Sequence, residues 1–462
     1  MTAQPVHPPP LIKVCPLCAA ELEPASQTCS RCWSNVREVT PRPAALPPAA
    51  AQPPLRARLA STALAVLAVA AAIYINWPRV PEPPAAFAAA SAGSAVAGST
   101  AWATAHGDAG GSRRTLAAPR LDGAVAWRRA LGSPLATDVV TDGRALYFGL
   151  QDGRLLALST ADGRELWSRP VPGRLDRAPV VAGELVFAGL RRGESGDLVA
   201  LEAASGEVRW RREYPHVPAP VVAGGIVWVA YNERLDALDP ESGELLRETI
   251  VEGKDIPGPL LIDGERIVLA TNRRVLFFDL STAVQTFFAR AGQPDYTVVA
   301  QSTVLAATRG AAVAWDVDQR QPWWEGIRGL WSIGYVMSLA PKVPDPPRRW
   351  AVSAPCLPRV TILAPVVGPE QVMLSCADGR IRAHALATGR LLWERAGTPL
   401  GSPPTLTAGG LLVVEAGALV LLDPATGAET ARRPFEQPLA GATVTAGCIY
   451  VVTKGQELMA LR

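Results

Sequence analysis

The stretch from Asp152 to Val171, "DGRLLALSTADGRELWSRPV", decides the fold, because its pattern returns along the chain. An apolar strand leads into a glycine turn, and a second strand ends near a tryptophan. Further copies, aligned on the turn glycine, are "ALEAASGEVRW" (200–210), "ALDPESGELLR" (237–247), "AHALATGRLLW" (383–393) and "LLDPATGAETA" (421–431). Two weaker copies begin at Phe277 and Ala314. A group of short strands that repeats about every 40 residues is typical of β-propellers.

A second phrase precedes each copy and reads as two apolar strands joined by a turn, as in "APVVAGELVFAG" (178–189). Together the two phrases predict four short antiparallel strands in each unit. The upstream phrases begin near Ser133, Ala178, Ala219, Gly258, Tyr296, Ala364, Ser402 and Gly441. A closed ring buries both apolar faces of every unit and leaves no strand edge open.

The two ends of the repeat region indicate how the ring would close. The chain stops at "ELMALR", a third strand without a fourth, while "DGAVAWRRAL" around Trp127 is a fourth strand without the other three. We therefore predict an all-β chain, with an eight-bladed β-propeller of four-stranded antiparallel blades at 121–462. Seven blades remain an alternative, because the unit from Tyr296 to Trp324 is the weakest copy, and tandem sandwiches are another.

The phrase A-x-D-x-x-[TS]-G-x-x-x-W resembles the repeat of the PQQ-like (quinoprotein-type, BamB-like) propeller family. In that family the tryptophan packs between neighbouring blades, and the Thr or Ser and the Gly of the turn shape the contact between blades. The resemblance implies blade-docking roles for Trp127, Trp167, Trp210, Trp324 and Trp393, with Gly163, Gly206, Gly243, Gly389 and Gly427 at the turns. Arg247, Phe287 and Ala431 depart from the tryptophan, so weaker contacts are expected there.

The same resemblance raises the question of catalysis. Quinoprotein dehydrogenases hold PQQ on the ring axis with calcium, a catalytic aspartate and, in many members, a disulfide between adjacent cysteines. None of the seven cysteines here are neighbours, and the four histidines are scattered. We therefore expect that the protein binds no PQQ and is not an enzyme. A PQQ-dependent oxidoreductase remains the alternative.

The N-terminal cysteines have the spacing of a metal site. "CPLCAAELEPASQTCSRC" pairs two C-x2-C turns, and four thiolates complete a tetrahedral shell for zinc. The segment resembles a zinc ribbon, predicted at 11–38 with Cys15, Cys18, Cys29 and Cys32 as ligands, although Ala19 replaces a glycine common after such turns. Two disulfides, or iron in place of zinc, remain alternatives.

A membrane crossing is predicted at 59–77, where "LASTALAVLAVAAAIYINW" carries no charge. About 20 apolar residues cross a bilayer as a helix. Basic residues precede the segment, which places the N-terminus in the cytoplasm and the propeller outside. A Pro/Ala-rich linker at 39–58 and a flexible Pro/Ala/Gly/Ser-rich stalk at 78–120 flank it, and a cleaved signal peptide is the rival interpretation.

An insertion at 325–359 interrupts the repeat. Long insertions on rigid scaffolds often carry binding, although this one could simply cap the ring. The aromatic and cationic residues that could bind a partner are Trp331, Tyr335, Arg348, Arg349 and Trp350. A disulfide between Cys356 and Cys376 could tie the insertion to the next blade, and Cys448 is expected to be a small buried residue.

These features predict a single-pass protein of the bacterial cell membrane. Its propeller would be a non-catalytic scaffold that binds protein partners outside the cytoplasm, and its ribbon could bind a cytoplasmic partner. A net charge of +3 gives no reason to expect nucleic acid. A sensor that signals to the ribbon is a further alternative.

Overall fold

The computed structural model describes residues 11–43, 102–251, 260–271, 274–291, 294–308, 310–344, 347–354, 356–357, 359–445 and 447–462. The chain divides into two compact units, Met1–Trp77 and Pro78–Arg462. The predicted transmembrane helix at 59–77 lies outside the described residues, as does the stalk up to residue 101. Within the described ranges, no helix has the length and apolarity needed to span a bilayer.

The N-terminal unit is a small three-stranded sheet in the order β2-β1-β3, with β1 at Leu11–Val14, β2 at Glu21–Leu22 and β3 at Arg42–Pro43. Its core is minimal: the buried side chains are Cys15, Leu22, Cys29 and Val36. The third strand extends the unit beyond the end predicted at residue 38.

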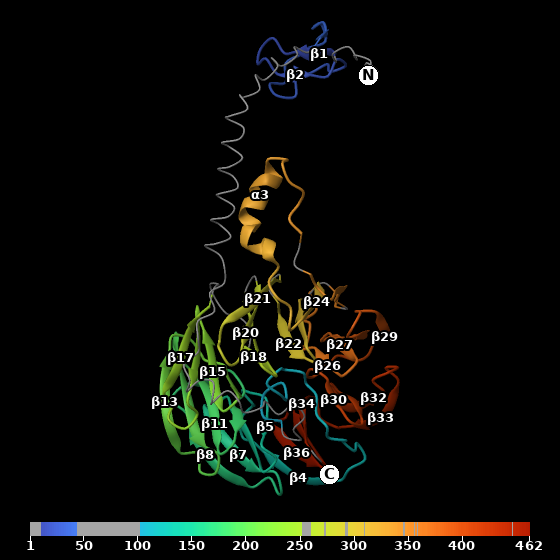
Figure 1. The fold of residues 1–462 in the computed structure, drawn as a ribbon. Helices are drawn as coiled ribbons and strands as arrows, with labels where there is room; N and C mark the ends of the chain where they lie inside the picture. Colours follow the sequence, from blue (N-terminus) through green and yellow to red (C-terminus); the bar gives the residue numbers. More distant parts are fainter. Residues whose placement is uncertain are drawn as a thin grey trace. The chain divides into compact units, whose positions relative to one another are not determined.

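The second unit is built of antiparallel sheets (Figure 1). Its described residues form seven four-stranded sheets and one five-stranded sheet, eight in all. The first four, in chain order, are β5 (Val140–Thr141), β6 (Ala145–Gly149), β7 (Arg154–Ser159) and β8 (Glu165–Pro170); β9 (Arg174–Leu175), β10 (Val180–Ala182), β11 (Leu185–Arg192), β12 (Ser195–Glu202) and β13 (Val208–Tyr214); β14 (Pro220–Ala223), β15 (Ile226–Tyr231), β16 (Arg234–Leu238) and β17 (Leu245–Ile250); β18 (Leu260–Asp263), β19 (Arg266–Ala270), β20 (Arg274–Asp279) and β21 (Gln285–Arg290).

The other four sheets repeat this plan. They are β22 (Tyr296–Ala300), β23 (Thr303–Ala307), β24 (Ala311–Asp316) and β25 (Trp350–Ser353); β26 (Val366–Val367), β27 (Gln371–Ser375), β28 (Ile381–Ala385) and β29 (Leu391–Arg395); β30 (Thr405–Thr407), β31 (Gly410–Glu415), β32 (Ala418–Leu422) and β33 (Glu429–Pro434); β34 (Leu439–Thr445), β35 (Cys448–Thr453), β36 (Glu457–Leu461) and β4 (Val125–Ala130).

Side-chain alternation along the strands gives every sheet two apolar faces. On β6, Leu146 and Phe148 enter one buried cluster, while Ala145 and Tyr147 enter another. Each of eight clusters joins two consecutive sheets, and one of them joins the last sheet to the first. The predicted β-propeller is therefore confirmed.

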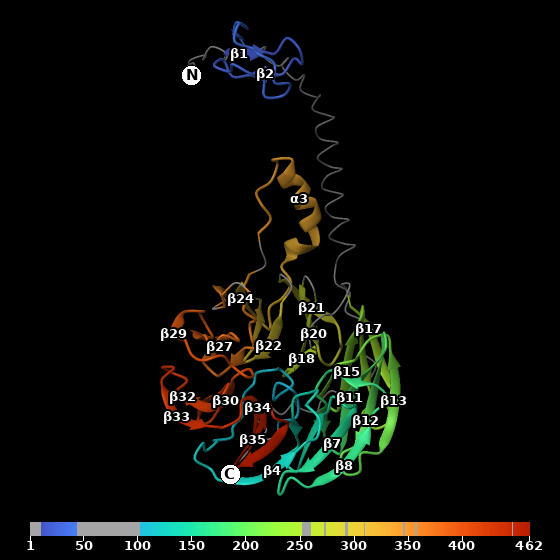
Figure 2. The same cartoon turned by 180° about the vertical axis from the view of Figure 1, so that it is seen from behind.

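The last sheet combines the two ends of the propeller sequence. Strand β4 pairs with β36 in antiparallel register, with Trp127 opposite Ala460 and Arg129 opposite Leu458. The C-terminus accordingly lies beside β4 in both views (Figures 1 and 2). The predicted completion of one sheet by the tail and the strand at Trp127 is confirmed.

The insertion leaves the propeller between the third and fourth strands of one sheet, β24 and β25. It contains a 3-10 helix η1 (Trp323–Ile327) and a helix α3 (Arg328–Val336). The predicted boundary of 359 is too late, because β25 already belongs to the sheet and pairs with β24.

Candidate functional site

The four N-terminal cysteines converge on one point. Their Sγ atoms all lie within 4.8 Å of one another, and no other such cluster of metal-ligating side chains occurs in the part of the chain that the structure describes. The Sγ atoms of Cys15 and Cys32 are 3.5 Å apart, and those of Cys18 and Cys29 are 3.6 Å apart. Four sulfurs at about 2.3 Å from a tetrahedral zinc ion would be about 3.8 Å apart. The cluster could therefore hold a metal ion such as zinc.

Two similar turns bring these thiols together. Ala19 donates its backbone N–H to the carbonyl of Cys15, and Trp33 donates to that of Cys29. Ala19 and Trp33 both adopt left-handed backbone conformations, with φ of 56° and 58°. This is the conformation that a glycine would adopt at least cost, so the sequence departure at Ala19 strains the turn without changing its geometry.

A hydroxyl beside the cluster favours thiolate. Ser34 Oγ lies 3.1 Å from the sulfur of Cys15 and 3.1 Å from that of Cys32. Its hydrogen bond lowers the pKa of Cys15 to about 6 and also lowers the pKa of Cys32. The pKa of Cys18 moves the other way, to about 12, because desolvation and the neighbouring sulfurs outweigh the backbone N–H of Ala20, which lowers it. A divalent cation would relieve that repulsion between sulfurs.

The docking tryptophans of the propeller connect neighbouring sheets. Trp167 donates its Nε1–H to the carbonyl of Ala203 in the next sheet at 2.9 Å. Beneath the ring lies Gly206, where an added Cβ would stand 2.6 Å from the indole. The same arrangement joins Trp127 to Gly163, Trp210 to Gly243 and Trp393 to Gly427, with the glycine φ between 68° and 73° throughout.

The predicted docking role of Trp324 is wrong. Trp324 lies in η1, outside the sheets. The fourth strand of that sheet carries Trp350, which donates to Leu386 O at 2.7 Å and covers Gly389. The error arose because the insertion separates the third strand from the fourth, so a fixed spacing selects a residue inside the insertion.

The five predicted partner-binding residues do not form one surface. Trp350 is buried in β25, and Arg349, just before that strand, pairs with Asp316 of β24 at 2.9 Å. Trp331 donates to Pro341 O within the insertion. Tyr335 and Arg348 are exposed.

A segment predicted to belong to the stalk lies at the centre of the ring. The first strands of neighbouring sheets contact one another, as β10 does with β5 and β14, so they are the innermost ones. Residues 102–117, here the axial segment, bond through their backbone to six of these eight strands. The acceptor–donor pairs are Trp102 O with Thr141 N, Ala103 O with Val181 N, Ala109 O with Ile262 N, Gly110 O with Val299 N, Ser112 O with Val367 N, and Arg113 O with Leu406 N.

The composition of the axial segment explains both its position and why it was missed. Its glycines and small residues lack apolar periodicity, which suggested a flexible stalk. The contact with β22 requires a glycine at position 110, since a Cβ on Gly110 would stand 2.1 Å from the carbonyl oxygen of Val299. Residues 102–120, which were predicted to belong to the stalk, are therefore part of the propeller unit.

Arg113 fixes the axial segment in place. This buried residue adopts φ of 53° and donates to the carbonyls of Pro404 and Ala105 at 2.9 and 3.2 Å. Burial lowers the pKa of Arg113. Burial also raises the pKa of the Asp138 carboxyl, although the positive charge of Arg113 opposes this rise. Asp138 and His106 line a cavity of about 490 Å³ beside the segment. A second cavity, of about 810 Å³, is lined by other residues of the segment, among them Gly110 and Ser112.

Comparison with known proteins agrees with this architecture. The family model described as "Outer membrane protein assembly factor BamB" matches residues 112–326 and 377–462, which is more than half of the chain. The chain belongs to the BamB family. No individually curated protein matches the sequence.

Solved structures with the fold of the BamB family include proteins of different kinds. BamB from Moraxella catarrhalis is 16% identical, with 75% of this chain and 92% of that chain covered and a TM-score of 0.49. The computationally designed Ika8 protein is 13% identical, with 73% and 99% covered and a TM-score of 0.55. Quinohemoprotein alcohol dehydrogenase from Comamonas testosteroni is 14% identical, with 76% of each chain covered and a TM-score of 0.55. Such low identities concern the fold alone.

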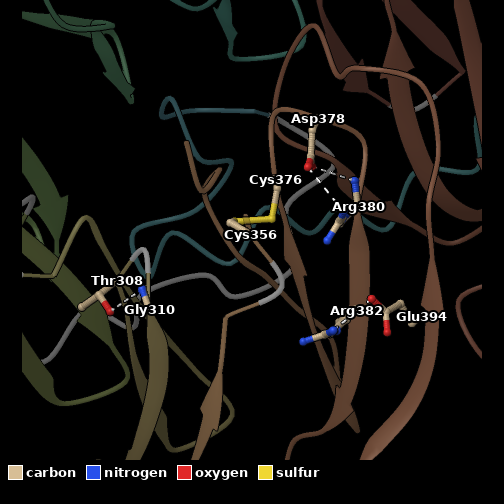
Figure 3. The surroundings of a disulfide bond; sticks show 8 residues. All are labelled: Thr308, Gly310, Cys356, Cys376, Asp378, Arg380, Arg382 and Glu394. Atoms are coloured by element: carbon tan, nitrogen blue, oxygen red, sulfur yellow. Dashed lines mark hydrogen bonds and ion pairs between the residues drawn. A yellow bond between two sulfur atoms is a disulfide. The ribbon is translucent and has the colours of Figure 1, made fainter. Parts of the chain in front are cut away.

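The unmatched residues 327–376 separate this chain from the BamB family model. They contain α3 and a disulfide between Cys356 and Cys376, with a Cα–Cα distance of 5.5 Å (Figure 3). The bridge links the segment after β25 to the end of β27, close to the pair formed by Asp378 and Arg380. The disulfide considered from the sequence is present, and Cys448 is free and buried, as predicted.

Proposed function

We propose that this protein is a membrane-anchored, extracytoplasmic scaffold of the bacterial cell envelope that binds other proteins and carries out no catalysis. Its propeller would have eight blades, one for each sheet. The axial segment carries this proposal, because it satisfies backbone groups of the innermost strands with the chain's own residues. The axial segment occupies the centre of the ring, and the outer surfaces of this rigid scaffold are available for binding.

The residues around the axis are a poor match for PQQ. A cofactor on the ring axis would compete for space with the axial segment. Gly110 of this segment lies so close to Val299 that an added Cβ would stand 2.1 Å from the carbonyl oxygen of Val299. The sequence lacks adjacent cysteines, and in the described ranges the only cluster of metal-ligating side chains is that of the N-terminal cysteines. These observations favour a scaffold over a quinoprotein oxidoreductase.

The cysteines support a topology with the two units on opposite sides of a membrane. Cys356 and Cys376 form a disulfide, which persists in oxidising compartments. Cys15 and Cys32 are not joined by a disulfide although their Sγ atoms are 3.5 Å apart, which suits a reducing compartment and metal binding through thiolates. The uncharged segment at 59–77 lies between the two sets in the sequence. We propose that it is the anchor, that the metal is zinc, and that the ribbon faces a cytoplasmic partner.

Photocross-linking in intact cells tests the scaffold proposal. A photoreactive residue in the full chain at Val208 or Ile250, which are 61% and 78% exposed on outer strands, would report contact with a partner. Val186, which is buried, is the matched control. We expect discrete protein adducts from exposed positions around the ring and none from position 186. If no exposed position yields a protein adduct, the propeller is not a protein-binding scaffold.

A separate assay tests catalysis. The purified full chain is mixed with PQQ and calcium, passed through a desalting column, and assayed for alcohol- or sugar-dependent dye reduction. We expect no retained cofactor and no reduction. Retention at one PQQ per chain with substrate-dependent reduction would make the protein an oxidoreductase.

A further inference from the structure

The helical insertion is a structure distinct from the propeller. Residues 323–344, here the insertion hairpin, contain η1, α3 and the chain that returns towards β25. Figures 1 and 2 show α3 standing clear of the sheets, and none of its residues is buried. None of its side chains belongs to the buried clusters that join the sheets. Val343, at its base, is buried. The propeller does not need this helix for its core.

The tip of the hairpin is apolar and exposed. From Gly329 to Pro341 the sequence "GLWSIGYVMSLAP" contains no charged residue. Soluble proteins rarely expose such a continuous apolar surface without a partner. The exposed side chains are Leu330 (46%), Ile333 (57%), Tyr335 (49%), Val336 (81%), Met337 (62%) and Leu339 (77%).

These side chains surround the helix. At about 100° per residue, Leu330, Tyr335 and Val336 point in three well-separated directions, and Ile333 lies between Val336 and Leu330. A helix that docks in a protein groove needs one apolar stripe, whereas a helix that is apolar all round suits an apolar medium. This distribution favours lipid over a protein groove.

Several polar groups of the hairpin are bonded within it, which lowers the cost of entry into lipid. Leu339 N–H donates to Gly334 O at 2.8 Å, which holds the turn that follows α3 against the helix. Trp331 Nε1–H donates to Pro341 O at 2.9 Å. Its charges lie at the base, where Arg328 bonds to Glu325 and to Pro344 O. Lys342 is exposed just beyond the uncharged stretch. Basic residues beside an apolar tip are suited to lipid headgroups.

We propose that the tip of the insertion hairpin inserts into one leaflet of a lipid bilayer, as a second membrane contact of the propeller. The uncharged stretch is too short to cross a bilayer, which needs about 20 residues, so it would lie at the interface. Trp331 and Tyr335 are side chains that favour that depth. This role goes beyond the proposed scaffold function and depends on no protein partner.

Depth-dependent quenching in vesicles tests this proposal. The full chain is reconstituted in phosphatidylethanolamine–phosphatidylglycerol vesicles with an environment-sensitive fluorescent amino acid at position 336, or at position 250 as the exposed control on β17. We expect a blue shift, protection from iodide and quenching by acyl-brominated lipid at position 336, with none of these at position 250. A second variant with Met337→Glu and Leu339→Glu should reduce the lipid quenching at position 336 at least threefold while leaving the melting temperature unchanged.

Two results would overturn the proposal. If position 336 is as accessible to iodide as position 250 and brominated lipid does not quench it, the hairpin does not enter the bilayer. If the blue shift appears only after envelope proteins are added, without quenching by brominated lipid, the occupant of the apolar surface is a protein. Neither result bears on the cross-linking at positions 208 and 250, so the scaffold function stands or falls separately.

Discussion

Trp127 on β4 lies opposite Ala460 on β36, and its indole covers Gly163 of the following sheet. Strand β4 therefore completes the last sheet, and its Trp127 docks that sheet against the first. Trp127 Nε1 also donates to Thr160 O at 3.2 Å, and Arg462 donates to the same carbonyl at 2.7 Å. The two ends of the propeller sequence thus meet at a single interface.

The tryptophan–glycine contact predicts unequal effects of two similar substitutions. Gly206→Ala should lower the free energy of unfolding by about 3 kcal/mol, because left-handed strain adds to displacement of the Trp167 ring. Gly183 has φ of 59° but nothing within 4 Å of an added Cβ. Gly183→Ala should therefore cost only about 1 kcal/mol. Urea unfolding measures both, and equal losses would contradict the docking role of Gly206.

The disulfide should stabilise the propeller measurably. Its cysteines are 20 residues apart, for which loop closure predicts about 3 kcal/mol. Cys356→Ser should lower the free energy of unfolding by that amount, and a reducing agent should lower the stability of the unsubstituted protein equally. Leu357→Ala, at the exposed neighbouring position, is the control with little expected change. A reductant-insensitive stability would mean that the bridge contributes nothing.

Metal removal should affect the two units differently. With cobalt as a probe, the full chain should give the absorption of a tetrahedral thiolate complex, which Cys18→Ser abolishes and Cys448→Ser preserves. A chelator should make residues 11–43 sensitive to protease, because the buried core there is too small to fold without metal. The unfolding midpoint of the propeller should not move. A ribbon that resists protease without metal would exclude a metal-dependent fold.

Acid should loosen the axial segment through His106. Burial and, second, the charge of Arg113 lower the pKa of His106 to about 4. In the unfolded chain histidine titrates near about 6.5, so the unfolded state takes up the proton first. Stability from the neutral imidazole is present above that value and is lost as the pH falls towards 4. In urea unfolding at pH 7 and pH 5, His106→Gln should lose less stability than the unsubstituted protein, whereas His216→Gln, at an exposed position, should not differ from it. Equal losses in all three proteins would contradict the buried, neutral state of His106.

The sequence predicts those parts of the molecule that depend on side chains at short range. The turn glycine and the tryptophan recur at fixed distances, so Trp167 and Gly206 were identified, and the cysteine spacing identified the ribbon cluster. Each of these signals lies within one unit of the repeat or within one pair of turns. Local pattern and local geometry agree at these positions.

Two features escaped sequence reasoning for physical reasons. The axial segment is held through backbone groups, and a glycine such as Gly110 leaves no apolar pattern to detect. The sequence predicts a partner-binding role for Trp350 because the insertion separates this residue from its strand partner, although "RRWAVS" from Arg348 resembles the other fourth strands. The sequence shows that an insertion exists but not which strand follows it.

Cross-linking across the last sheet tests the closed ring most directly. Leu131 N donates to Gln456 O at 3.0 Å, so the adjacent pair of Ala130 and Glu457 is a non-hydrogen-bonded pair, whose Cβ atoms lie close enough for a disulfide. In a variant with Ala130→Cys and Glu457→Cys, mild oxidation should join the two positions almost completely within one chain, which peptide mass spectrometry would detect. The control variant, with Ala130→Cys and Lys454→Cys, should not cross-link. Free maleimide reaction at both positions 130 and 457 without any disulfide would mean that the two ends of the propeller do not meet.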